Sequence, residues 1–165
     1  ADEQKKASAA AMTRVQKDLD NLEGLLAKVT VPNRENLLCM EVTYSPKDGV
    51  WNGGTFHFAI RFPEDYPYTA PRVYYLGPHR IFHPNIEGDE GKAEWGVCIN
   101  ILRADWKPIM GLRDVVLGIE ILFSEPNIDD PLPGVAKEAA QMLKNNEQQF
   151  IRKTQAWMQG RYIQQ

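Results

Sequence analysis

Cys98 is the residue of this chain best suited to covalent chemistry, because a thiolate is a strong nucleophile and a thioester remains activated for a second transfer. It follows the turn sequence His83-Pro84-Asn85 and precedes the segment Trp106-Lys107-Pro108. A neutral amide such as that of Asn85 can donate a hydrogen bond to an oxyanion without titrating. The cysteine and the amide together indicate acyl transfer through a covalent intermediate.

Each of these residues also has a structural interpretation. A lone cysteine is more often a buried, inert thiol, but the interval between Asn85 and Cys98 is polar and contains glycine, which predicts an exposed loop and an accessible thiol. Cys39 lies in an alternating pattern, so we expect it to fill a strand. His83 precedes a proline, which favours a turn-stabilising role over that of a catalytic base, and Asn85 could also serve the turn.

A second candidate is the acidic segment Ile128-Asp129-Asp130-Pro131-Leu132. Its ordinary role would be that of a loop whose carboxylates cap a helix. If a carboxylate lay beside an acyl-cysteine, it could instead orient an incoming lysine amine and help to remove its proton. Trp106 and Pro108 are most simply packing and turn residues, though an exposed pair could form a docking surface.

Composition excludes several classes of function. The chain has 165 residues and a formal net charge of −3, which predicts a single domain over residues 1–165 and argues against nucleic acid as a ligand. No stretch approaches the roughly 20 apolar residues of a membrane span. Two cysteines and three histidines show no zinc-ligand spacing. We therefore expect a soluble intracellular protein without a metal site.

The apolar pattern predicts the elements that position the candidate residues. Apolar side chains recur at steps of three and four over residues 7–23, which indicates an amphipathic first helix. Alternation over residues 38–44 and 55–62 predicts two antiparallel strands joined through a glycine turn at Asn52-Gly53-Gly54. A third run at 72–76, after a proline-rich link, completes a short meander.

Helices are expected to follow the cysteine segment. Residues 112–123 predict a long buried helix that ends before Pro126. The tail over residues 135–162 predicts two helices that meet near Asn145-Asn146. One helix, then strands, then helices indicates the α+β class.

Taken together, these motifs resemble the ubiquitin-conjugating enzyme family, whose signature is a His-Pro-Asn turn followed by the thioester cysteine. The resemblance spans nearly the whole chain and includes the first helix, the turn at 51–54, the segment 62–67, His83-Pro84-Asn85, Cys98, Trp106-Lys107-Pro108 and the segment 125–132. It implies a ubiquitin-conjugating fold with an N-terminal helix, an antiparallel meander sheet, a long central helix and C-terminal helices.

Within the family the chain is most similar to the neddylation branch, which carries the Nedd/Rub modifier to cullins. The similarity lies in residues 5–19, 100–108 and 137–146, and Asn100 stands where ubiquitin carriers commonly have aspartate. The resemblance implies that residues 1–6 are the remnant of an N-terminal extension and that the chain is a cytoplasmic and nuclear monomer. It implies as partners a ubiquitin-like modifier, a heterodimeric activating enzyme, a RING-type ligase and a cullin. No cofactor is expected on this chain, since the activating enzyme uses the ATP.

The resemblance also assigns roles to individual residues. Cys98 would accept the C-terminal glycine of the modifier, Asn85 would stabilise the oxyanion and Asp130 would tune the acceptor lysine. His83 and Pro84 would hold the turn. The residues implied as contacts for partners are Tyr68, Pro108 and Ile109 for ligases and activating enzymes, and Leu117 and Ile121 for a folded-back modifier.

Two departures from the family pattern and three rival functions stay open at this stage. The interval between Asn85 and Cys98 is longer than usual, which puts their geometry in question although extra loop residues cost little free energy. Tyr68 replaces a frequent phenylalanine, which leaves the choice of ligase open. The rivals are a carrier of ubiquitin, a non-catalytic scaffold of the same fold, which would lack the cysteine, and a cysteine hydrolase, which would need His83 or another base against Cys98.

Overall fold

One antiparallel sheet forms the centre of the molecule. The computed structural model describes residues 2–88 and 91–162, and over these ranges six strands pair in the order β1-β2-β3-β4-β6-β5. The strands are β1 (Lys28–Thr30), β2 (Cys39–Tyr44), β3 (Phe56–Arg61), β4 (Arg72–Gly77), β5 (Ile86–Glu87) and β6 (Trp95–Val97). The helices of the same ranges are α1 (Asp2–Leu19), the 3₁₀ turn η1 (Asn100–Leu102), α2 (Leu112–Ser124), α3 (Val135–Asn145) and α4 (Glu147–Met158).

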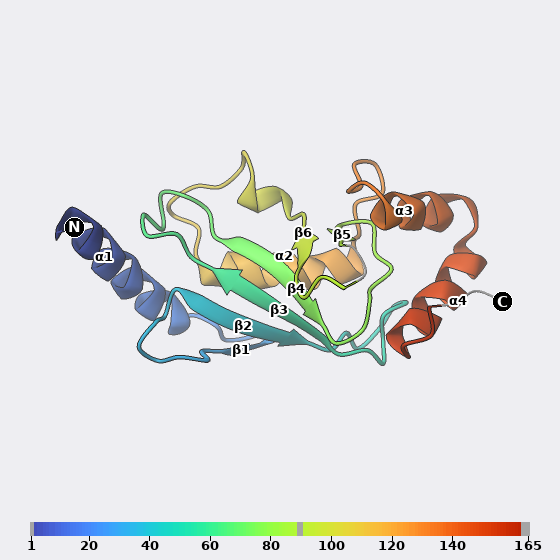
Figure 1. Ribbon diagram of the computed structural model, residues 1–165, viewed down its shortest axis with the longest axis horizontal. Coiled ribbons are helices and arrows are strands. Elements are labelled where there is room, and N and C mark those ends of the chain that lie inside the picture. Colours follow the sequence, from blue (N-terminus) through green and yellow to red (C-terminus); the bar gives the residue numbers. More distant parts are fainter. Residues whose placement is uncertain (1, 89–90, 163–165) are drawn as a thin grey trace.

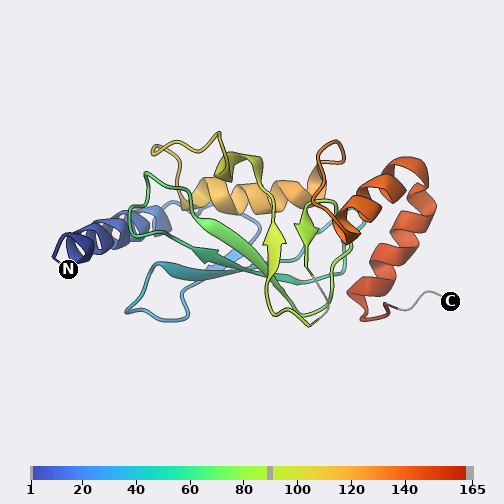
Figure 2. The same ribbon diagram turned by 45° about the horizontal axis from the view of Figure 1, so that its top comes forward.

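Helix α2 covers one face of the sheet, while α1 lies at one end of the molecule and α3 and α4 lie at the other (Figure 1, Figure 2). Alternation in β2 turns Met40, Val42 and Tyr44 toward the helix, where they are buried. Phe123 of α2 packs edge-on against Tyr44, with ring centroids 5.3 Å apart. The predicted α+β class and the long buried helix are confirmed.

The first helix differs from its predicted bounds of 7–23. It begins at Asp2, because residues 2–6 contain strong helix formers and two acidic side chains in the first turn, although they lack an apolar stripe. It ends at Leu19, where a turn closes through a hydrogen bond from Asp20 N to Lys17 O of 3.2 Å. High helix propensity therefore extends the N-terminal end of α1 beyond the residues that show the apolar period.

The exposed loop predicted between Asn85 and Cys98 is wrong at its two ends, whereas residues 91–93 are exposed as expected. Strands β5 and β6 pair there as a hairpin, and Ile86 and Trp95 are buried at 1% and 5% exposure. Positions 89–90 of the predicted loop lie outside the described residues. The buried tryptophan and isoleucine anchor the two strands of the hairpin.

The two C-terminal helices meet where the sequence indicates. Asn146 caps α4 by accepting a hydrogen bond from Gln149 N at its Oδ1, 3.2 Å away. Phe150 and Trp157 of α4 bury their rings against Phe82, with centroids 5.6 and 5.3 Å away. Among the helices of the described ranges, none is long and apolar enough to cross a bilayer.

Candidate active site

Asn85 and Cys98 lie side by side at the base of the β5–β6 hairpin. Asn85 immediately precedes β5 and Cys98 immediately follows β6, and the pairing of Ile86 with Val97 sets them opposite each other. Cys98 N donates a hydrogen bond to Asn85 O of 2.9 Å. The longer interval therefore does not separate the two residues, because the hairpin accommodates its extra length beyond this pair.

The two cysteines differ from their predicted exposure. The Cys98 residue is only 9% exposed, so the prediction of an accessible thiol on an open loop is wrong. Cys39, expected to fill a strand, faces solvent from the outer side of β2, with its Sγ 3.6 Å from Asn36 Nδ2. Cys98 is buried directly after β6, whereas Cys39 lies at the surface.

His83 is locked inside the core. It is fully buried and lies against Trp51 and Phe123, with ring centroids 4.6 and 5.5 Å away. Its Nε2 donates to Leu122 O at 2.7 Å and its Nδ1 accepts from Asn85 N at 3.0 Å, because a carbonyl can only accept and an amide N–H can only donate. Both ring nitrogens are thus committed, so the ring orients the turn and has no lone pair left for Cys98.

We predict that His83 stays neutral at pH values well below the usual pKa of a histidine, 6.5. Burial lowers its pKa from 6.5 to about 4, although the bond to Leu122 O opposes the shift. Between pH 6.5 and 4 the unfolded chain binds a proton that the folded chain excludes, so the free energy of unfolding falls as pH falls through this window. The stability that the neutral ring contributes is fully present above pH 6.5 and amounts to about 3 kcal/mol in total. An imidazole NMR titration should show one Nε2–H tautomer from pH 8 to 5.5, and a ring that titrates near 6.5 would contradict this geometry.

The side chain of Asn85 joins the turn to the segment that follows α2. Its Nδ2 donates to Asn127 O and its Oδ1 accepts from Asn127 N, each at 2.9 Å. One amide hydrogen makes the first of these bonds, and the second hydrogen on Nδ2 has no partner among the described residues. Asn85 therefore combines a structural tether to Asn127 with a second amide hydrogen, and its backbone is bonded to that of Cys98.

Asn127 shapes the acidic segment and was not singled out from the sequence. Its Oδ1 accepts from Asp129 N at 3.1 Å and from Asp130 N at 3.2 Å, which forms an Asx-type turn. Leu132 N donates to Pro84 O at 3.1 Å, which ties the segment back to the turn. Asp130 is exposed, with its backbone fixed from both sides. The Asn three positions before Asp130 was the available sequence signal.

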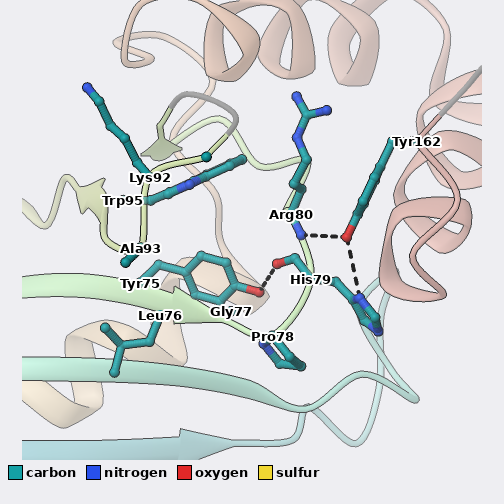
Figure 3. Close-up of a pocket in the computed structure, with 11 residues that line it drawn as sticks. Tyr75, Leu76, Gly77, Pro78, His79, Arg80, Lys92, Ala93, Trp95 and Tyr162 are labelled. Carbon is teal, nitrogen blue, oxygen red and sulfur yellow. Dashed lines mark hydrogen bonds between the residues drawn. The ribbon is translucent and has the colours of Figure 1, made fainter.

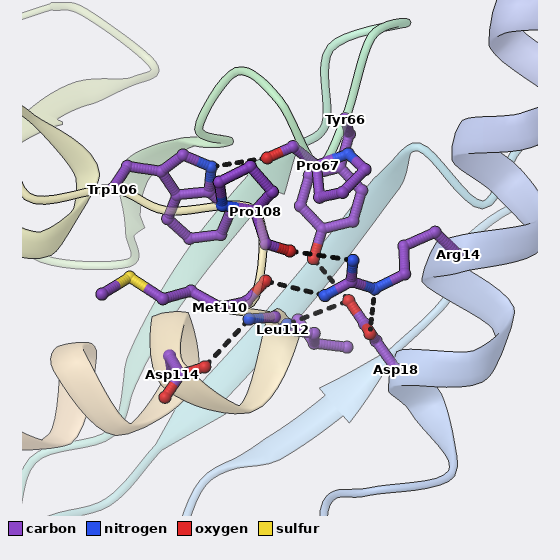
Figure 4. A network of polar contacts seen from close by, with 10 residues as sticks. Arg14, Asp18, Tyr66, Pro67, Trp106, Pro108, Met110, Leu112 and Asp114 are labelled. Atoms are coloured by element: carbon purple, nitrogen blue, oxygen red, sulfur yellow. Dashed lines mark hydrogen bonds and ion pairs between the residues drawn. The ribbon is translucent and has the colours of Figure 1, made fainter.

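Tyr68, Pro108 and Ile109 lie on two loops that are joined to each other. Tyr68 is 77% and Ile109 88% exposed, and Pro108 is also exposed. Trp106 Nε1 donates to Pro67 O at 2.7 Å, which links the loops (Figure 4). The half-buried Trp106 thus packs beneath an exposed apolar surface instead of forming part of it.

A polar network anchors this surface to α1 (Figure 4). Arg14 donates to Pro108 O at 3.0 Å and to Met110 O at 2.9 Å, and it pairs with Asp18 at 3.0 Å. Asp18 also accepts from the hydroxyl of Tyr66. Burial and this bond raise the pKa of Tyr66, so the phenol remains a donor.

Leu117 and Ile121 lie one turn apart on the outer side of α2, at 42% and 44% exposure. Gly118 stands between them, and a Cβ there would meet Ile99 Cγ2 at 3.0 Å. The glycine lets the segment after Cys98 approach the helix closely. The exposed helix face and the cysteine segment are therefore in direct contact through Gly118 and Ile99.

A pocket of about 200 Å³ lies elsewhere, between the end of β4, residues 91–93 and Tyr162 (Figure 3). Arg80 N donates to Tyr162 Oη at 3.0 Å at its edge. Neither Cys98, Asn85 nor Asp130 lines this pocket. Within the described ranges, no group of three or more His, Cys, Asp and Glu is placed to hold a metal ion.

A sequence profile described as "Ubiquitin-conjugating enzyme" matches residues 12–158. The chain belongs to the ubiquitin-conjugating enzyme family. The match includes the turn, Cys98, α2 and both C-terminal helices. The resemblance drawn from the sequence motifs is thereby confirmed, and so is the ubiquitin-conjugating fold.

Relatives and solved structures are similar over nearly the full chain. The NEDD8-conjugating enzyme UBC12 of Yarrowia lipolytica is 38% identical over 94% of this chain and 82% of its own length. The Nedd8-conjugating enzyme UbcE2M of Drosophila melanogaster is 39% identical over 96% and 82%. The structure of S. cerevisiae Ubc12 superposes with a TM-score of 0.80 at 34% identity, over 94% of this chain and 82% of that one.

Proposed function

We propose that this conjugating enzyme accepts NEDD8, or the corresponding Rub modifier, as a thioester on Cys98 and transfers it to a substrate lysine, with cullins as the acceptor class. The observation that supports the chemistry is the pairing of Cys98 with the amide-bearing Asn85. The choice of modifier rests on relatives from fungi, an insect and a plant that are named as NEDD8-conjugating enzymes at 36–39% identity.

The first step is an exchange of thioesters. The Cys98 thiolate attacks the C-terminal carbonyl of the modifier on the activating enzyme, a new S–C bond forms, and the thiolate of the activating enzyme leaves. No metal or nucleotide is needed on this chain, since the acyl group arrives already activated.

The second step is aminolysis. The lysine amine attacks the thioester carbonyl, the carbonyl oxygen becomes an oxyanion, and collapse of the intermediate releases the lysine amide and the Cys98 thiolate. The spare N–H of Asn85 Nδ2 is the donor proposed for the oxyanion. The exposed carboxylate of Asp130 is proposed to orient the amine and to help remove its proton.

His83 favours transfer to lysine over hydrolysis because it cannot act as a base at Cys98. A cysteine hydrolase needs a base that activates water, and both nitrogens of His83 are engaged elsewhere. Without an imidazole base at the thioester, water remains a poor nucleophile, whereas a neutral lysine amine is a strong one. This argument ranks transfer above hydrolysis.

We propose the surface of Tyr68, Pro108 and Ile109 as the docking site for the activating enzyme and a RING-type ligase, and Leu117 with Ile121 as the contact for the bound modifier. Each site groups large exposed apolar side chains, on two linked loops or one helical turn apart, and contiguous apolar patches mark sites of protein interaction.

The deciding experiment charges the purified chain with ATP and either the NEDD8 or the ubiquitin activating enzyme with its modifier. We expect a thiol-sensitive adduct on a non-reducing gel with NEDD8 only. Charging with ubiquitin alone would keep the chemistry and overturn the branch. An absence of adduct with either modifier would favour the scaffold function.

A further inference from the structure

Helices α2 and α3 both begin at a residue that cannot cap them. Their N-cap positions are Gly111 and Gly134, which carry no side chain, although the first N–H groups of a helix need acceptors. A carboxylate from a distant segment fills each role. Asp18 Oδ2 accepts from Leu112 N at 3.2 Å, and Glu87 Oε2 accepts from Ala136 N at 2.6 Å.

The two glycines make room for these carboxylates. A Cβ at Gly111 would lie 3.1 Å from both oxygens of Asp18, and a Cβ at Gly134 would lie 3.1 Å from Glu87 Oε1. Gly134 also has a φ of +75°, which other residues rarely adopt. Each glycine therefore supplies no side-chain cap of its own and leaves space for the distant carboxylate, while in α2 Asp114 also accepts from Gly111 N at 2.9 Å.

The cap on α3 is the third anchor of the acidic segment. Asn127 is tied to the side chain of Asn85, Leu132 N is bonded to Pro84 O, and Ala136 N is bonded to Glu87. All three anchors come from residues 84–87, which lead directly into the hairpin that carries Cys98. The position of the acidic segment relative to the thiol is thus set by this short stretch of chain.

We propose that Glu87 is a positioning residue for lysine transfer: by capping α3 from a distance it fixes the segment that carries Asp130 beside Cys98. A carboxylate at a helix N-terminus is favoured by the helix dipole and by a charge-assisted bond. The inference rests on the proposed function, because it concerns the second step of that reaction. Charging of Cys98 does not depend on the acceptor amine and is unaffected.

The test compares Glu87→Ala with Glu138→Ala. Glu138 lies in the first turn of the same helix but pairs with Lys153 at 2.8 Å and is 51% exposed, so its removal leaves the cap intact. We expect normal charging of both variants and, in single-turnover discharge to free lysine, about a tenfold slower rate for Glu87→Ala only. The deficit should shrink as pH rises toward 10, because a deprotonated amine no longer needs the carboxylate.

Two further variants separate the effect of side-chain length from that of charge. They also keep the test informative if Glu87→Ala unfolds. Glu87→Gln retains an oxygen at the same reach and should recover most of the rate, whereas Glu87→Asp keeps the charge but is one methylene short and should stay slow. Discharge by Glu87→Asp at the wild-type rate, or equal losses in Glu138→Ala, would overturn the proposal. Failure of the wild-type chain to charge would count against the proposed function. If Glu87→Ala is charged and discharged at the wild-type rates, the result would count against this inference alone.

Discussion

Replacing Cys98 with alanine should abolish the thiol-sensitive adduct completely, because no other described residue beside Asn85 carries a nucleophile that can hold a thioester. Cys98→Ser should still be charged slowly, but as an oxyester that survives thiol treatment and is cleaved by hydroxide. The measurement is a non-reducing gel after incubation with the activating enzyme, with and without added thiol.

Cys39 provides the matched control. It is the more exposed thiol of the two, so if accessibility alone selected the acceptor it would be the better candidate. We expect Cys39→Ser to charge like the unaltered chain. An adduct that persists in Cys98→Ala and disappears in Cys39→Ser would place the reaction on β2 and remove the turn from the mechanism.

The sequence predicted the elements whose pattern is long and regular. Helix α2 and the pair α3 and α4 were recovered because apolar positions repeat over several turns and because Pro126 and Asn146 mark their ends. Strands β2 and β4 alternate over six residues each, β3 has an apolar run, and all three were recovered. The fold class followed from the order of these elements.

Short strands were missed for a physical reason. Strand β5 has two residues and β6 has three, which is too few for an alternating pattern to appear. Their pairing depends on the burial of Trp95 and Ile86 in the core, which is a tertiary effect. The exposure of Cys98 was misjudged for the same reason, since a hairpin replaced the expected loop.

The distant helix caps were also beyond the reach of sequence reasoning. Asp18 and Leu112 are 94 positions apart, and Glu87 and Ala136 are 49 apart. Local rules look for a cap within a few residues, and there they find glycine. A glycine at a helix start is a weak signal that a distant residue caps the helix. The fold is needed to identify the residue that supplies the carboxylate.

Replacing Asn85 with alanine should allow charging of Cys98 but slow the transfer to lysine by about 100-fold, the loss typical of one oxyanion donor. The structure gives the change two consequences, because Asn85→Ala removes both the spare N–H and the two bonds to Asn127. Single-turnover discharge to free lysine measures their sum. A discharge rate equal to that of the unaltered chain would exclude Asn85 from the second step.

Asn127→Ala separates the two consequences. It removes the Oδ1 that holds Asp129 N and Asp130 N but leaves the backbone bonds to Asn85, so it loosens the acidic segment while the amide of Asn85 stays in place. An oxyanion donor acts on the carbonyl oxygen whatever the protonation of the amine, so the Asn85→Ala deficit should persist at high pH. The Asn127→Ala deficit should be smaller and should fade as the amine deprotonates. Equal deficits with the same pH dependence would mean that Asn85 acts only as a tether, and the oxyanion would then need a donor other than this amide.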